Sequence, residues 1–397
     1  MNSTIIGEQK SCNENGLIFE INSLSDYLGR IPDQRKRKGV RYSLANVLLL
    51  MLLAKMGGED NPTGMAEWIQ HRREGLVELL KLPRQSVPHH STYRRILQEV
   101  IEPEQFEEII GEYNRQRAKD QSEVIVSMDG KTLRGSIPYG QLRGVHLLAA
   151  YLPNSGLTLM EIAVDRKENE IVVAPQVLRR MDLAGVIVIA DAMHAQRQIS
   201  CQIVEAGGHF AWTIKGNQAR TQWAIQHLFA HEVANLKKGA PLSKGFQAAN
   251  QPTSKAHGRI EKRSILVSQE LNGYLDWPYL AQVFRIEREI WHAHAQRRTR
   301  QVIYGLTSLS PQQANPRRLL DLMRNYWGIE NGLHYRRDVT LREDATRAVV
   351  GHTSHNLAIL NNLVISLCLP NGWKNLAKAR RLFNAKPELA LCLICQA

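Results

Sequence analysis

Two apolar runs that each lead into an aspartate decide the fold class. Residues 124–130 read Val-Ile-Val-Ser-Met-Asp-Gly, and residues 186–191 read Val-Ile-Val-Ile-Ala-Asp. Short apolar runs rich in β-branched residues are typical of strands that are buried on both faces of a sheet. The sequence therefore predicts two buried strands, the first ending at Asp129-Gly130 and the second at Asp191.

The segments around these two runs alternate between strand and helix patterns. Strands are expected at Val145 to Tyr151 and Leu157 to Val164, and again at His209 to Lys215, whereas Glu170 to Met181 and His194 to Ala206 have helical patterns. The resulting order is β-β-β-α-β-α-β. Three adjacent strands followed by alternating helices indicate a mixed sheet in an α/β domain.

The regions on either side of this core have different secondary-structure patterns. Residues 24–117 have helical patterns and no clear strand, with Ser43 expected to cap a helix that runs through Met56. Beyond the core, residues 237–257 read as polar and irregular, and three strands are expected between Arg259 and Thr307.

The chain is therefore expected to form three parts. They are a leader at 1–22, an all-α domain at 23–118 and an α/β domain at 119–397 that contains a β-rich insertion at about 235–307.

Composition limits the partners and the compartment. The chain has 397 residues, 51 of them Lys or Arg and 38 Asp or Glu, which gives a formal net charge of +13. This excess favours a polyanion, with nucleic acid ahead of an acidic membrane. A hydrophobic content of 43% excludes a disordered basic tail protein, and the longest apolar run, 47–54, is far shorter than the roughly 20 residues of a membrane span. Five scattered cysteines are typical of a cytoplasmic protein.

A third acid lies in a helical segment near the C-terminus. Tyr326, Glu330 and Leu333 are spaced at i, i+4 and i+7, which predicts that Glu330 lies on an inward apolar stripe with Leu319 and Met323. A buried carboxylate needs a partner, because burying an unpaired charge is costly. Either an arginine or a metal ion would satisfy this requirement.

Each of the three acids has a structural and a catalytic interpretation. Asp129 is consistent with a turn, Asp191 with a helix cap, and Glu330 with an ion pair to Arg324 or Arg337. Alternatively, three convergent carboxylates provide the hard oxygen ligands that suit Mg²⁺ or Mn²⁺.

Ten short motifs in a fixed order make the second interpretation specific. They lie at residues 33–44, 88–95, 129–136, 167–171, 191–196, 215–218, 257–261, 327–335, 338–339 and 343–344. In these motifs the chain resembles DDE insertion-sequence transposases of the ISAs-type group, which includes the H-repeat-associated transposase-like proteins of Rhs elements. The matching pieces extend from about residue 24 to 370.

The resemblance implies an RNase H-like catalytic domain in which Asp129, Asp191 and Glu330 hold two Mg²⁺ or Mn²⁺ ions. Paired ions of this kind activate the attacking oxygen and stabilise the leaving one. It also implies cleavage at the ends of an insertion sequence, followed by attack of the freed 3′-OH on target DNA. Double-stranded DNA and a homodimer on DNA are the implied partners, and a nucleoid location follows from them.

Several cations are candidates for contacts with DNA phosphates. The densest run is Arg35, Lys36, Arg37 and Lys38, and a second cluster includes Arg297, Arg298 and Arg300. The resemblance adds Lys131 and Arg337. Although Gly130-Lys131-Thr132 is similar to the end of a phosphate-binding P-loop, Ile125 replaces the required upstream glycine, so no nucleotide cofactor is expected. Two other functions stay open: an RNase H-like nuclease that does not join strands, and a decayed or domesticated DNA-binding protein.

Overall fold

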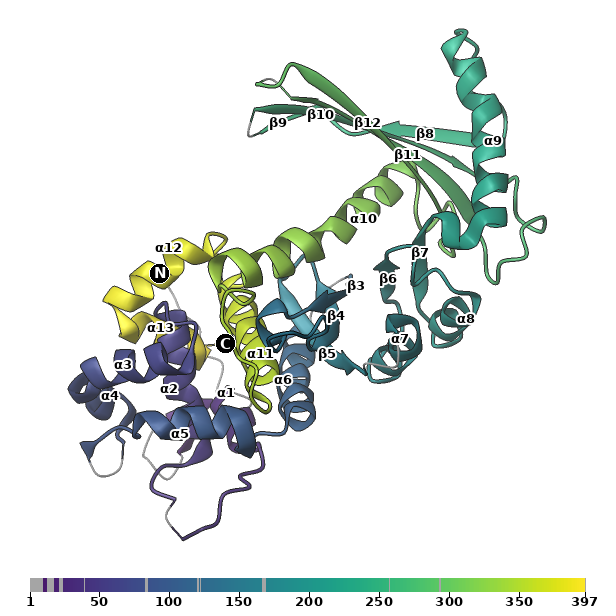
Figure 1. Ribbon diagram of the computed structural model, residues 1–397. Helices are drawn as coiled ribbons and strands as arrows, with labels where there is room; N and C mark the ends of the chain where they lie inside the picture. Colours follow the sequence, from purple (N-terminus) through teal and green to yellow (C-terminus); the bar gives the residue numbers. More distant parts are fainter. Residues whose placement is uncertain are drawn as a thin grey trace. The chain divides into compact units, whose positions relative to one another are not determined.

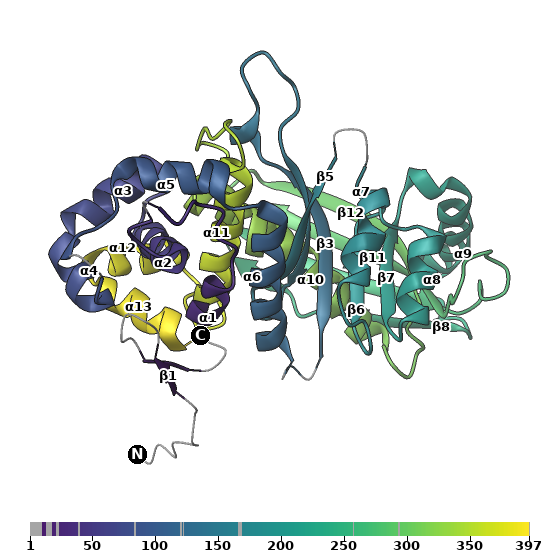
Figure 2. The same cartoon turned by 90° about the horizontal axis from the view of Figure 1, so that it is seen from below.

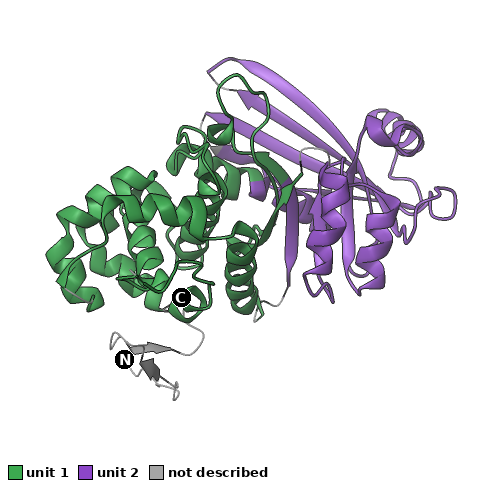
Figure 3. Cartoon of the chain, turned by 60° about the horizontal axis from the view of Figure 1, so that its bottom comes forward, with its two compact units in different colours: residues 1–121, 130–166, 330–397 green, residues 122–129, 167–329 purple. Residues whose placement is uncertain are grey.

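The computed structural model describes residues 10–12, 18–20, 24–38, 40–82, 85–119, 121, 123–165, 169–256, 258–292 and 294–396. Two compact units make up the chain (Figure 3): unit 1 contains Met1–Gln121, Gly130–Arg166 and Glu330–Ala397, and unit 2 contains Ser122–Asp129 and Lys167–Ile329. Within the described part, no helix has the length and apolar character required to cross a membrane.

The helices are distributed over both units (Figure 1). Unit 1 contains α1 (Leu24–Gly29), α2 (Leu44–Met56), α3 (Pro62–His71), α4 (Arg73–Leu80), α5 (His90–Arg95), α6 (Pro103–Ala118), α11 (Thr353–Cys368), α12 (Leu376–Ala385) and α13 (Pro387–Gln396). Its shorter helical segments are η2 (Ile96–Val100), η3 (Arg134–Ser136), η5 (Glu330–His334) and η6 (Arg336–Thr340). Unit 2 contains α7 (Glu170–Arg179), α8 (Arg197–Glu205), η4 (Gly216–Gln218), α9 (Ala219–Lys237) and α10 (Pro316–Ile329).

The strands form a small pair and a large mixed sheet. The pair is β1 (Lys10–Cys12) with β2 (Ile18–Glu20). The large sheet contains β3 (Ile125–Thr132), β4 (His146–Leu152), β5 (Leu157–Val164), β6 (Ile187–Ala190), β7 (His209–Ile214), β8 (Phe246–Asn250), β9 (Ser254–Ala256), β10 (Arg259–Ser268), β11 (Gln282–His292) and β12 (Arg297–Thr307). The strand order is β5-β4-β3-β6-β7-β12-β11-β10-β8, with β9 paired to β10.

This order confirms the predicted fold class. β3 is parallel to β6, and β6 is parallel to β7, whereas β4 and β5 are antiparallel, as expected for an RNase H-like mixed sheet. The β-rich insertion continues the sheet through the antiparallel pairing of β12 with β7.

The core of unit 2 explains why the apolar runs are continuous. Alternate residues of β6, Ile187 and Ile189, join a cluster that includes Leu319 and Met323 of α10. The residues between them on β6 are also buried, because both faces of the strand are covered. Figure 2 shows α7 and α8 beside β6 and β7.

In unit 1 the helix α2 lies at the centre of a helical bundle. Nearly all its residues are buried, and it contacts α1, α3, α11, α12 and α13. The Ser43 side chain accepts a hydrogen bond from the Asn46 backbone N–H at 3.2 Å, and Gly57 ends the helix, as predicted.

Several local expectations differ from the structure. β3 does not end at Asp129-Gly130 but continues through Thr132, and β8 and β9 lie in the stretch expected to be irregular. Helix α8 begins at Arg197 and not at His194, and the C-terminal helix α13 was not predicted. Most of the predicted leader at 1–22 lies outside the described residues.

Candidate active site

Asp129 and Asp191 follow one aligned rung of the sheet. Met128 on β3 is the parallel register partner of Ala190 on β6, and each aspartate is the next residue along its strand direction. Neighbouring strands in a sheet lie about 4.8 Å apart. The two aspartates therefore occupy equivalent positions on adjacent parallel chains within unit 2, although Asp129 lies inside β3 and Asp191 just beyond the end of β6.

A tight loop holds the Asp191 backbone. The Asp191 side chain accepts a hydrogen bond from the Met193 N–H at 2.8 Å, and its carbonyl accepts one from the His194 N–H at 3.2 Å. This short-range bonding is typical of an Asx-turn, and it explains why the following helix starts late. The predicted helix-cap role of Asp191 is wrong, because the N-cap residue of α8 is Gln196 and the Asp191 carboxylate closes a turn within the loop.

Three of the sequence motifs converge on this loop. His194, which is completely buried, lies with Nε2 3.0 Å from Oε2 of Glu170 at the start of α7. After β7, the Asn217 side chain donates to the Ala192 carbonyl at 2.5 Å and the Gln218 side chain donates to the Ala195 carbonyl at 3.0 Å. The motifs at 167–171, 191–196 and 215–218 therefore share one task, which is to fix the loop that carries Asp191; Lys167 and Glu168 of the first motif lie outside the described residues.

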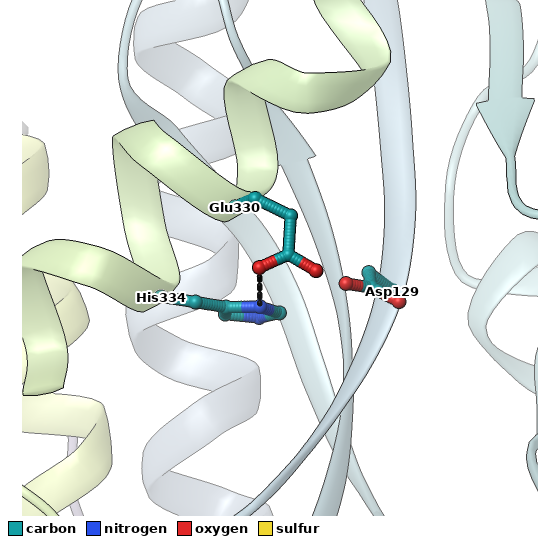
Figure 4. Close-up of side chains that lie close together, drawn as sticks. All are labelled: Asp129, Glu330 and His334. Carbon is teal, nitrogen blue, oxygen red and sulfur yellow. Dashed lines mark ion pairs between the residues drawn. The ribbon is translucent and has the colours of Figure 1, made fainter. Parts of the chain in front are cut away.

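Glu330 differs from its predicted environment. It begins the π-helix η5 directly after α10, and its side chain is 55% exposed, so the expected inward position on an apolar stripe is wrong. Its Oε2 atom lies 3.9 Å from Nδ1 of the buried His334, four residues later (Figure 4).

Glu330 and His334 lie together on η5 in unit 1, whereas Asp129 and Asp191 belong to unit 2. Within the described residues of unit 1, Asp338, Glu343 and Asp344 form a second group of acids that could hold a cation.

Lys131 lies among this second group of acids. Its Nζ is 2.5 Å from Oδ1 of Asp338, 3.6 Å from Asp344 and 4.0 Å from Glu343, and its side chain is 8% exposed. The ammonium group therefore occupies the place where a cation would bind. The expected DNA contact by Lys131 is corrected: its charge is used inside the protein.

Arg337 is also internal and not a surface cation. Its completely buried guanidinium contacts Glu161 of β5 at 2.5 Å and Glu343 at 2.9 Å. Asn362 donates to Glu161 and Asn361 donates to Glu343, both at 2.8 Å. Burial alone would lower the pKa of Arg337, but the two carboxylates outweigh that effect and raise it. The predicted phosphate contact by Arg337 is thus replaced by a buried ion-pair network.

This network was not predicted as a unit. Burial, and then the nearby charge of Glu161, raise the pKa of Glu107 on α6 well above its usual range, so Glu107 is the acid of this region that favours the neutral form. A sequence signal existed, because Glu161 is the single charged residue in the mostly apolar strand β5. A lone charge in a buried strand indicates a partner, but it does not identify Arg337 as that partner.

The predicted DNA-binding cations differ in how exposed they are and in whether they form ion pairs within the protein. Arg35 is held by Asp33, at 2.6 Å, and by the Tyr42 carbonyl, at 2.9 Å, whereas Lys36, Arg37 and Lys38 are exposed. In the insertion, Arg297 and Arg298 are exposed at the start of β12. Arg300 is exposed but forms an ion pair with Glu287.

Comparisons with known proteins show the family of the chain. The family model "Transposase DDE domain" matches residues 120–367, and the model "DDE_Tnp_1-associated" matches residues 25–114. The putative transposase YncI of Escherichia coli O157:H7 is 27% identical over 359 residues, covering 88% of each chain. The H repeat-associated putative transposase YhhI of Escherichia coli K12 is 25% identical over 354 residues, covering 88% of this chain and 91% of that one.

Among solved structures, the piggyBac transposase in a synaptic complex with hairpin DNA aligns with a TM-score of 0.44 at 9% identity, over 94% of this chain and 78% of that chain. This likeness is too weak to carry an argument. The family model, by contrast, matches well over half of the residues, in the same region that contains Asp129, Asp191 and Glu330. The chain therefore belongs to the Transposase DDE domain family.

Proposed function

We propose that this chain is a metal-dependent DNA transposase that cleaves DNA at the ends of an insertion sequence and joins the freed 3′ ends to target DNA. Asp129, Asp191 and Glu330 are the proposed catalytic acids. The observation that carries the proposal is the alignment of Asp129 and Asp191 beyond the Met128–Ala190 rung, in a chain whose residues 120–367 match the Transposase DDE domain model.

The donor set fits a divalent cation. Carboxylate oxygens are the ligands of Mg²⁺ and Mn²⁺, and the three proposed acids supply up to six of them. When bound, such ions supply Lewis-acid activation of the attacking oxygen and charge stabilisation at the leaving oxygen. Two ions would match the usual arrangement for phosphodiester chemistry.

The chain's own residues contribute positioning. The Asx-turn and the Glu170–His194 pair hold Asp191, and the His334 ring lies 3.9 Å from the Glu330 carboxylate. Misplacing a reacting group by about 1 Å costs on the order of a hundredfold in rate. Rigid support of the acids is therefore expected to matter as much as their identity.

The test combines metal binding with chemistry. Asp129→Asn, Asp191→Asn and Glu330→Gln are each expected to weaken Mn²⁺ binding at least about tenfold in calorimetry. Each is also expected to abolish Mg²⁺-dependent nicking of a labelled duplex that carries the terminal sequence flanking the gene. Asp276→Asn is the matched control, because the Asp276 side chain is 90% exposed and forms a surface ion pair with Arg197. Full nicking by Asp191→Asn with Mg²⁺ present would overturn the proposal.

The same assay separates the alternatives. A pre-cleaved end that yields a joined product rejects a nuclease without strand transfer. DNA binding with no metal-dependent nicking by the unaltered chain would instead identify a decayed or domesticated DNA-binding protein. A dimer on DNA, proposed from the family resemblance, is tested by the mass of the chain–DNA complex in light scattering.

A further inference from the structure

A large groove lies within the helical part of unit 1, in a region that the proposed chemistry does not use. It has a volume of about 1330 Å³ and is lined by residues of three segments: the loop at 34–38 and 40–42, helix α3, and the stretch from Ser86 through η2. Helices α3 and α5 contact each other (Figure 2). The cation run that begins at Arg35 and the Pro88–Arg95 motif, about fifty residues apart in sequence, both line the groove and therefore form one surface.

The groove concentrates cations that no carboxylate neutralises. Lys36, Lys38, Arg41 and Arg95 line it, all four are exposed, and none forms an ion pair within the described part of the chain. Elsewhere in unit 1, arginines are commonly paired, as in Arg380 with Asp60 at 2.5 Å. Unpaired cations that converge on one hollow surface favour a polyanionic ligand over a structural role.

The remaining polar groups of the groove suit phosphate oxygens. His89 and His90 stand with ring centroids 4.0 Å apart, and Nδ1 of His89 lies 2.9 Å from the Ser91 hydroxyl. Imidazole and hydroxyl groups are common phosphate contacts in protein–DNA complexes. Two acids, Glu67 and Glu99, also line the groove and oppose an anion there.

We propose that this groove binds the sugar-phosphate backbone of duplex DNA, independently of the metal ions. The inference rests on the proposed function for the choice of DNA as the polyanion, and it deepens that function by giving the helical region a DNA-anchoring role. Contacts of this kind position a protein on DNA without reading its sequence. Binding is therefore strongly salt-dependent and weakly sequence-dependent.

The first experiment removes the four cations. The full chain carrying Lys36→Gln, Lys38→Gln, Arg41→Gln and Arg95→Gln is titrated against a fluorescein-labelled 30-base-pair duplex of random sequence, with EDTA present. We expect at least about tenfold weaker binding and a salt slope smaller by about three to four, near 0.9 per lost phosphate contact. Arg73→Gln, Lys81→Gln, Lys374→Gln and Lys386→Gln remove the same charge from exposed positions of unit 1 outside the groove, and should change binding little.

A second variant should increase the affinity for the DNA duplex, an effect that misfolding cannot produce. Glu67→Gln with Glu99→Gln removes the two opposing carboxylates and should tighten duplex binding by about three- to tenfold. Glu78→Gln with Glu388→Gln, both exposed and outside the groove, is the matched control.

Three outcomes would overturn the inference: unchanged binding by the groove variant, an equal loss in its control, or tighter binding of a 30-base single strand or RNA duplex than of the DNA duplex. The proposed function fails separately. If the groove variant loses duplex binding while the unaltered chain never nicks DNA, the anchoring role stands and the transposase proposal falls. If the acid variants abolish nicking but the groove variant binds DNA normally, the transposase proposal stands and the anchoring role of the groove falls.

Discussion

The Nζ atom of Lys131 lies 2.5 Å from Oδ1 of Asp338. Lys131 is two residues beyond Asp129 on β3, and Asp338 is on η6, eight residues beyond Glu330. Both residues belong to unit 1, so this bond ties η6 to the end of β3. The motif alone would assign Lys131 to a DNA contact. In the structure Lys131 instead bonds to Asp338, and each of these two residues lies near a proposed catalytic acid in the sequence.

Lys131→Met is expected to reduce nicking without reducing DNA affinity. The substitution leaves Asp338, Glu343 and Asp344 without their shared cation, and the resulting shift of η6 should lower kcat by about ten- to a hundredfold. Affinity for a duplex in EDTA should be unchanged, because Lys131 is nearly buried. Lys374→Met, at an exposed position, is the control. A loss of affinity with a normal kcat would restore the DNA-contact interpretation.

Arg337→Met is expected to destabilise the fold. The variant leaves Glu161 and Glu343 buried without a countercharge, and breaking a buried ion pair from one side typically costs about 3–5 kcal/mol. Urea unfolding followed by circular dichroism measures this loss as a lower midpoint. Arg347→Met should stay within about 0.5 kcal/mol of the unaltered chain, because Arg347 is exposed and has no described ion pair. Equal midpoints for the two variants would contradict the structural role of Arg337.

Lys55 gives the chain a pH-dependent stability. It is 1% exposed within α2, and burial lowers its pKa to about 8, with Asp60 opposing the shift. The unfolded chain, with a Lys pKa near 10.5, therefore binds more protons than the folded chain between about pH 8 and 10.5. From this group alone, the free energy of unfolding rises with pH across that window, by about 3 kcal/mol in total.

The difference in unfolding free energy between the unaltered chain and Lys55→Met isolates this effect. The free energy of unfolding of the unaltered chain should rise relative to that of Lys55→Met as the pH increases from 8 to 10.5. The same difference measured with Lys378→Met, at an exposed position on α12, should be flat. A flat difference for Lys55→Met would show that Lys55 titrates alike in both states.

Local sequence signals predict those helices and strands that are determined by residues close together in the sequence. The run before Asp191 is a strand because its β-branched residues are buried on both faces, and Ser43 starts α2 because its side chain caps the helix. Asp129-Gly130 shows the limit of such signals, since a pair that locally favours a turn lies inside β3. There the pairing of distant strands, continued by the Leu133 N–H to Val145 carbonyl bond of 2.8 Å, outweighs local preference.

Glu330 shows a second limit. The predicted stripe assumes a continuous α-helix, but the chain changes to a π-helix at Glu330. A π-helix pairs residues at i and i+5, so a stripe read at i+4 does not continue through it. Sequence identified the residue through its motif, but it did not predict its exposed environment or its pairing with His334. The Arg337 network was missed for a related reason, because its members come from strands and helices far apart in the chain.

The insertion makes a final distinction between neighbouring arginines. Glu287 on β11 forms ion pairs with Arg285, at 2.5 Å, and with Arg300. The hydrogen bond from Arg300 lowers the pKa of Glu287 to about 2, although burial opposes this. Arg297 and Arg298, opposite His292 and Trp291 on β11, have no described ion pair. Of the three predicted cations Arg297, Arg298 and Arg300, the first two are therefore the ones available to phosphates.

Arg297→Gln with Arg298→Gln should reduce the salt slope of duplex binding by about two, at 0.9 per phosphate. Arg300→Gln, which removes an equally exposed but already neutralised charge, should reduce it by less than about one. Glu287→Gln should tighten binding, because it releases the exposed Arg300 from its carboxylate. Fluorescence anisotropy at several salt concentrations measures all three slopes. If Arg300→Gln matches the effect of the double variant, pairing with Glu287 does not limit access to DNA, and exposure alone decides which cations of the insertion bind.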